Sequence, residues 1–220
     1  GAAFTNTAGD FTVSGDTTFA QDFTMTAGTF TLSANKTLEL TSDIEFESTC
    51  TYADAANAEL DFNGGNLTIA KASTIAADIT LTQATTFTID AAVTMSDTAF
   101  VIDQDLTVDG NNTLTLATTS GKTSDLTLSG TAGGVTFSGA ATNTSGDITI
   151  GDAVTLTTTG AFTYTAGDVT VGGGASGTWT CTGGCTKAAG DITIADNGVF
   201  TLGAAFTNTA GDFTVSGDTT

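Results

Sequence analysis

The stretch ITIGDAVTLTTTGAFTY, residues 148–164, contains the pattern that decides the fold. Residues 148–150, 154–156 and 162–164 each read apolar, Thr, apolar. Such alternation is typical of a short β-strand with one buried face, because successive side chains point to opposite sides. Gly and Asp between the segments indicate turns. Three short strands joined by turns predict one coil of a solenoid with three faces, apolar inside and coated with Thr outside.

The same triplet recurs along the chain at intervals of 17 to 23 residues, from Phe11 to Phe213. The members between these two begin at Phe30, Cys50, Leu67, Phe87, Leu106, Leu126, Ile148, Val169 and Ile192. A second period near 20 residues is typical of stacked coils. We predict an all-β fold, a parallel β-helix of about 20 residues and three short strands per coil, with right-handed winding from the crossover rule.

An exact repeat marks a third period. The string GAAFTNTAGDFTVSGDTT occupies residues 1–18 and again, letter for letter, residues 203–220. We therefore predict that residues 1–202 form one large tandem repeat of about ten coils and that residues 203–220 begin the next identical repeat, continuous with the first. Coils spaced by about 4.8 Å would make one such unit about 48 Å long.

An antiparallel sandwich is the main alternative fold, because it also has many short strands separated by turns. It would show spacings of about 8 to 12 residues without a higher-order period. The absence of proline also favours stacked coils, since each inner coil pairs on both sides and a ladder has no place for a residue without N–H.

Charge and composition exclude several classes of function. The chain has 24 acidic residues, four basic residues that are all Lys, no His and a formal charge of -20. This balance argues against binding nucleic acid or an anionic membrane surface. No apolar run is long enough to span a bilayer, so membrane insertion is not expected. Without His, a Ser or Cys nucleophile lacks its usual base, and we expect no enzyme activity.

Thr-rich triplets, Gly-Asp turns, few cations and large identical repeats resemble the passenger and stalk regions of bacterial surface adhesins. Filamentous haemagglutinin-like and autotransporter β-helix proteins are the nearest group. The resemblance covers the whole chain and implies an extracellular location. Curli-type amyloids have repeats of similar length, but their regular Gln and Asn ladders are missing. Pectate-lyase-like enzymes share the β-helix, and the Arg of their chemistry is absent here.

Asp precedes many of the triplets and has two interpretations. One is a turn residue that accepts a backbone N–H, and the other is a column of calcium sites. The densest acidic cluster, Asp103, Asp105 and Asp109, is the calcium candidate, although its spacing does not match an EF-hand loop. No other cofactor is expected.

Cys181 and Cys185 are separated by three residues and are candidates for a local disulfide, with two free thiols as the alternative. Cys50 would then be unpaired and buried. Four Asn-X-Ser/Thr sequons are glycosylation candidates, at Asn35, Asn66, Asn111 and Asn143.

These observations predict a non-enzymatic extracellular structural filament or adhesin shaft, built from β-solenoid repeats that stack end to end with copies of themselves. Its role would be surface attachment or the formation of a matrix or biofilm. The alternative is a module that binds carbohydrate or another surface through Thr and aromatic side chains. Ice binding through flat Thr arrays is a third interpretation, although Thr also suits exposed strand positions in general.

Overall fold

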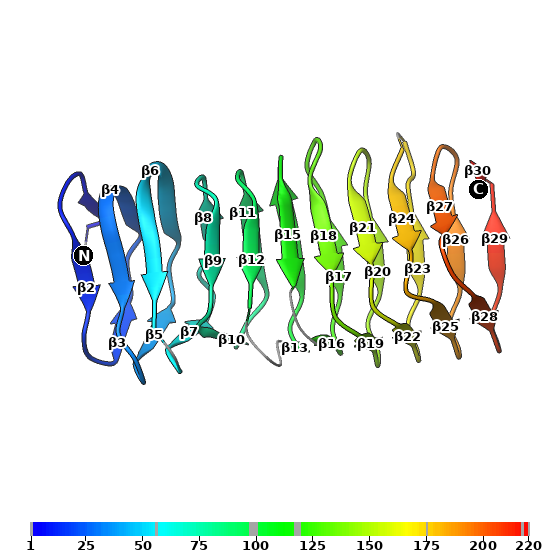
Figure 1. The fold of residues 1–220 in the computed structure, drawn as a ribbon, viewed down its shortest axis with the longest axis horizontal. Coiled ribbons are helices and arrows are strands. Elements are labelled where there is room, and N and C mark those ends of the chain that lie inside the picture. Colours follow the sequence, from blue (N-terminus) through cyan, green and yellow to red (C-terminus); the bar gives the residue numbers. More distant parts are fainter. Residues whose placement is uncertain are drawn as a thin grey trace.

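The computed structural model describes residues 2–55, 57–96, 101–116, 120–174, 176–216 and 218–219, with the backbone alone at 101, 120–122 and 218–219. Its turns stack along one long axis, from the N-terminal coil to the C-terminal coil (Figure 1). Parallel strands form a β-solenoid with roughly 21 residues per turn. The prediction of an all-β parallel solenoid is confirmed. Over the described ranges there is no helix that could cross a membrane.

Four parallel sheets contain the strands. The 12-stranded sheet comprises β1 (Phe4–Asn6), β2 (Phe11–Val13), β4 (Phe23–Leu32), β6 (Ile44–Asp54), β8 (Leu67–Ile69), β11 (Thr85–Ile89), β14 (Leu106–Gly110), β17 (Leu126–Leu128), β20 (Ile148–Ile150), β23 (Val169–Val171), β26 (Ile192–Ile194) and β29 (Phe213–Val215). The eight-stranded sheet comprises β9 (Ser73–Ile75), β12 (Val93–Met95), β15 (Thr113–Leu116), β18 (Gly134–Phe137), β21 (Thr155–Thr158), β24 (Thr178–Cys181), β27 (Val199–Leu202) and β30 (Asp218–Thr219).

The other two sheets are smaller. The four-stranded sheet comprises β3 (Thr17–Phe19), β5 (Thr37–Leu40), β7 (Glu59–Phe62) and β10 (Asp78–Leu81). The six-stranded sheet comprises β13 (Val101–Ile102), β16 (Ser120–Lys122), β19 (Ala141–Asn143), β22 (Phe162–Tyr164), β25 (Cys185–Lys187) and β28 (Phe206–Asn208).

Each turn passes over three faces in order. The first face runs from β1 through the first halves of β4 and β6 to β8 and on to β29. The second face begins with β2 and the second halves of β4 and β6 and continues in the eight-stranded sheet from β9. The third strand of each turn lies in the four-stranded sheet up to β10 and in the six-stranded sheet from β13, and these strands make up the third face.

The alternating triplets fold as their pattern predicts. In β20, Ile148 and Ile150 are buried while Thr149 between them is exposed. The next coil repeats this arrangement in register, with Val169 beside Ile148 and Thr170 beside Thr149. Apolar side chains therefore stack into continuous interior columns, and Thr forms matching columns outside.

The Gly-Asp corners need glycine for a physical reason. Gly190 has φ +80°, and a Cβ there would overlap the carbonyl oxygen of Gly167 one coil before. Gly167 has φ +97° at the equivalent corner. Only a residue without a side chain combines this left-handed conformation with so close an approach of two backbones.

One part of the expected stacking differs in the structure. The 17-residue step from Cys50 to Leu67 is not a stack of neighbouring coils, because Leu67 lies beside Ile44. Strand β6 extends from Ile44 to Asp54 and passes over the first face and then the second, with a shift of its register against β4 between the two halves. Cys50 and Leu67 therefore lie on different faces.

Candidate functional site: the corner ladder and the end coils

An aspartate ladder occupies the corner that precedes the first face. It consists of Asp105, Asp125, Asp147, Asp168, Asp191 and Asp212. The backbone N–H of each later member donates to Oδ1 of the member one coil before, over 3.2 Å for the first pair and 2.8 Å for the other four. Each accepting carboxylate thus satisfies a backbone donor at a turn, the usual role of Asp in turns.

The three calcium candidates, Asp103, Asp105 and Asp109, accept different hydrogen bonds in the structure. The backbone carbonyl of Asp103 accepts a hydrogen bond from Ser124 Oγ at 2.7 Å, while Asp105 begins the aspartate ladder. Asp109 lies on β14 and accepts the N–H of Gly110 at 2.7 Å. Among the described residues there is no group of three or more His, Cys, Asp or Glu that could hold a metal ion. Calcium binding therefore stays a prediction, without a preassembled cluster in that part of the chain.

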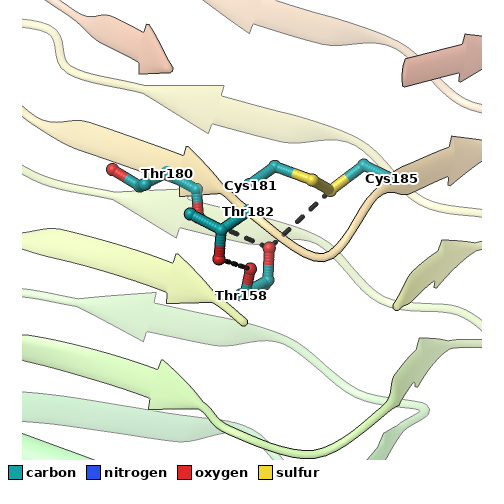
Figure 2. The surroundings of a disulfide bond; sticks show 5 residues. All are labelled: Thr158, Thr180, Cys181, Thr182 and Cys185. Carbon is teal, nitrogen blue, oxygen red and sulfur yellow. Dashed lines mark hydrogen bonds between the residues drawn. A yellow bond between two sulfur atoms is a disulfide. The ribbon is translucent and has the colours of Figure 1, made fainter. Parts of the chain in front are cut away.

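A disulfide joins Cys181 and Cys185 across the corner between the second and third faces, with a Cα–Cα distance of 6.3 Å (Figure 2). Thr158, one coil before, lies beside this bridge: its Oγ1 is 3.7 Å from the sulfur of Cys185. The hydroxyl of Thr182 donates to the Thr158 carbonyl at 3.0 Å. Cys50 is free and buried, and burial raises the pKa of its thiol, which disfavours the reactive thiolate.

The four sequons differ in accessibility. Asn35 is exposed in a turn with φ +57°, and Asn111 is also exposed. Asn66 is half-buried, and its side-chain amide donates to Asp43 Oδ1 at 2.9 Å, so a glycan would break a corner hydrogen bond. Asn143 is fully buried. The folded coil has no room for a glycan at Asn143, and the accessible candidates are Asn35 and Asn111.

A polar column inside the third face was not predicted. Asn143, Tyr164 and Lys187 occupy matching interior positions of successive coils, where the alternation calls for apolar residues. The amide of Asn143 donates to the carbonyls of Gly146 at 3.2 Å and of Ala166, in the next coil, at 2.8 Å. Each of the three stands three residues before the Gly of a Gly-Asp corner, and this spacing is the sequence signal that would have found them.

The N-terminal end of the solenoid carries an aromatic cluster, one Phe from each strand of the first coil. Phe4, Phe11 and Phe19 surround Phe23 of the next coil, with ring centroids 5.5, 4.9 and 4.9 Å from it. Phe4 is 51 % exposed, although side chains at matching positions further along are buried. The four rings line a hollow of about 240 Å³ on this end. The first coil thus presents an apolar edge with strands paired on one side.

The C-terminal end repeats this chemistry. Phe206 and Phe213, the second copies of Phe4 and Phe11, pack around Phe200 with centroid distances of 5.6 and 5.7 Å. Leu202 and Val215 are 41 % and 40 % exposed nearby. Both ends therefore combine open strand edges with large apolar side chains, a combination suited to association with another strand layer.

In comparisons with known proteins, no family model, no curated protein and no solved structure matches the chain. The class of protein is therefore defined by the fold alone. The geometry defines a parallel β-solenoid.

Proposed function

We propose that this chain is part of an extracellular structural filament or adhesin shaft, in which β-solenoid units stack end to end with copies of themselves. The observation that carries the proposal is that the same 18-residue string forms the apolar coil at both ends of the solenoid. Because this coil is repeated letter for letter, every unit begins with the same strand edge and the same apolar side chains. Each further unit can therefore stack on the one before through the same contacts.

Backbone ladders along the axis would supply the stiffness of such a shaft, because each inner strand is bonded to the coil before and the coil after. The negative charge on the sides would keep neighbouring shafts apart. The Cys181–Cys185 disulfide supports an oxidising, extracellular setting.

Sedimentation tests this proposal on the 220-residue chain. We expect the average mass to rise with concentration and electron microscopy to show thin unbranched rods. Phe4→Asp should weaken the association about tenfold, because it places a charge where about 1.4 kcal/mol of apolar burial is expected. Thr149→Asp, at an exposed position on the side of the first face, is the matched control and should leave association unchanged. A chain that stays monomeric at all concentrations would count against the shaft.

A second candidate, a module that binds carbohydrate or another surface, is favoured by two regular Thr columns. The first face carries Thr86, Thr107, Thr127, Thr149, Thr170, Thr193 and Thr214 in register. The second face carries Thr74, Thr94, Thr115, Thr136, Thr157, Thr180 and Thr201. Glycan-array binding lost in Thr136→Glu would support this candidate, and ice recrystallisation assays of the same variant test ice binding.

A further inference from the structure

The two copies of the repeated string occupy different faces of the solenoid. In the first copy, FTN forms β1 on the first face and FTV forms β2 on the second face. In the second copy, FTN forms β28 on the third face, and FTV forms β29 on the first face. The identical sequences are therefore offset by one face.

The series of triplets changes face between the third and fourth coils, because the Cys50 triplet lies on the second face and the Leu67 triplet on the first. The first half of β6 pairs with β8, so Glu45 lies beside Thr68. The second half of β6 lies against the segment around β9: Lys71 Nζ donates to Thr51 Oγ1 at 2.8 Å, and the N–H of Ala76 donates to Asp54 at 2.8 Å. Each turn contains three strand segments, one on each face, and β4 and β6 each supply two of these segments. The chain therefore advances by 29 segments from β1 to β28, which is nine turns and two thirds.

We infer that successive 202-residue units are related by a rotation of one third of a turn about the solenoid axis. This inference rests on the proposed end-to-end stacking and specifies its register. The first coil of a unit would lie on the coil 185–202 of the unit before, with β1 beside β25, β2 beside β26 and β3 beside β27. The second copy of the string is already seated this way within the chain, where β28 pairs with β25 and β29 with β26.

The side chains at this join support the rotated register. Buried Lys187 donates to the Ala210 carbonyl at 2.8 Å and to Asn208 Oδ1 at 3.4 Å. The string supplies the same acceptors in its first copy, as Asn6 and Ala8. Without the rotation, Asn6 and Ala8 would lie over the corner after β26 and not over the corner after β25 that holds Lys187.

The aspartate ladder also continues through the join only in the rotated register. Asp191 Oδ1 accepts the N–H of Asp212, the second copy of Asp10. Asp10 Oδ1 in turn accepts the N–H of Thr29 in the following coil, at 2.9 Å. A rotated unit would therefore extend the ladder from Asp191 through its own Asp10 to Thr29 without a gap.

In a tandem array, each face of one unit would continue as a different face of the next unit, and the original orientation would return after three units. Any group exposed on one face of a unit would then appear in turn on all three sides of the shaft. The partner of the N-terminal edge is thus a second copy of this repeat. A three-faced end permits three orientations of that copy, and the inferred one is the orientation that places β1 beside β25.

Paired cysteines in the full chain test the offset, in a Cys50→Ala background that keeps the native disulfide. Glu45→Cys/Thr68→Cys places the two residues on adjacent parallel strands, within disulfide reach, whereas Thr51 lies one face away from Thr68. We expect the Glu45→Cys/Thr68→Cys pair to give at least about tenfold more disulfide than Thr51→Cys/Thr68→Cys under mild oxidation, measured by peptide mass.

Thr193→Cys/Thr214→Cys, neighbours at the join, is the positive control for cross-linking. Equal yields from the two test pairs, or more disulfide from Thr51→Cys/Thr68→Cys, would overturn the one-third rotation. The cross-links form within one chain, so their yields can be measured whether or not the chains assemble. A failure to assemble in sedimentation would contradict the filament proposal, and the cross-linking yields would still test the rotation.

Discussion

The ammonium of Lys187 lies 2.8 Å from the carbonyl oxygen of Ala210, which belongs to the following coil. Lys187 is 1 % exposed, and its other acceptor is the neutral amide oxygen of Asn208. A buried cation held by neutral oxygens loses much of its hydration, which offsets the gain from the hydrogen bonds. Lys187 therefore links two coils in a defined register at little net gain in stability.

Replacing Lys187 tests that relationship. We expect Lys187→Met to leave the free energy of unfolding within about 1 kcal/mol of the natural value or to raise it, since a buried charge is exchanged for an apolar chain of similar volume. Lys187→Ala should lower it by about 2–4 kcal/mol because a cavity remains. Urea titration followed by the fluorescence of buried Trp179, the single Trp, measures both. A larger loss in the Met variant than in the Ala variant would contradict this account.

Reduction of the Cys181–Cys185 disulfide should destabilise the fold modestly. The bridge closes a loop of about five residues, for which the chain-entropy relation gives about 2 kcal/mol. The urea midpoint should therefore fall when a reductant is added. The Cys181→Ser/Cys185→Ser variant is the control and should show no response to reductant. A midpoint that is insensitive to reductant in the natural chain would mean that the bridge contributes nothing.

The aspartate ladder balances hydrogen bonding against charge repulsion. Asp168 accepts the N–H of Asp191 and is flanked by like charges one coil away, about 4.8 Å along the axis. Asp168→Asn keeps an acceptor oxygen and removes the repulsion, so stability should rise by about 0.5–1 kcal/mol at low salt and less at high salt. Asp168→Ala removes the acceptor and should cost about 1 kcal/mol.

Asn66 is a natural example of the amide in a corner position, because its Oδ1 accepts the N–H of Thr86 at 2.8 Å. If thermal unfolding in a salt series showed Asp168→Asn to be as damaging as Asp168→Ala, charge repulsion would play no part in the ladder.

Alkaline pH should destabilise the protein through its two tyrosines. Burial, with Asp147 and then Asp168 nearby, raises the pKa of Tyr164, and burial with Asp54 raises the pKa of Tyr52 well above its usual range. The folded state thus keeps protons that the unfolded state releases above about pH 10. The contribution of the two tyrosines is therefore fully present below pH 10 and falls as the pH rises, by about 1.4 kcal/mol per pH unit for each tyrosine. The buried Cys50 thiol, whose pKa is also raised, adds a loss of the same sign that begins near the unfolded thiol pKa of about 8.5.

Urea titrations between pH 8 and 11.5 measure this slope. Tyr164→Phe should make the slope shallower by one tyrosine's share. At neutral pH the same variant should be as stable as the natural chain or more so, because the buried Tyr164 hydroxyl makes no well-formed hydrogen bond to any of the described residues. An unchanged slope in Tyr164→Phe would contradict the assignment.

Local alternation was enough to predict the strands, because residues such as Ile148, Thr149 and Ile150 lie beside residues of the same kind in the coils on either side. It could not predict the face on which each strand lies. That depends on how many faces the chain covers between two triplets, and the 17-residue step from Cys50 to Leu67 covers two faces and not a full turn. The stacking error at Leu67 has this cause.

The candidate site was predictable only in part. The Cys181–Cys185 spacing indicated a local bridge, and the Asp positions indicated a corner column. The interior polar column was missed because Asn, Tyr and Lys share no single chemistry, and their burial follows from the strand position that they occupy.

A stack of parallel coils has a mechanical consequence when its two termini are pulled apart. Strand pairing connects each coil mainly to the two coils beside it, so force applied along the axis acts on one coil boundary at a time. A coil of roughly 21 residues that peels away and straightens releases about 70 Å of chain. A tether made this way would yield in successive steps of similar length and would dissipate a sudden load while most of its length remained folded.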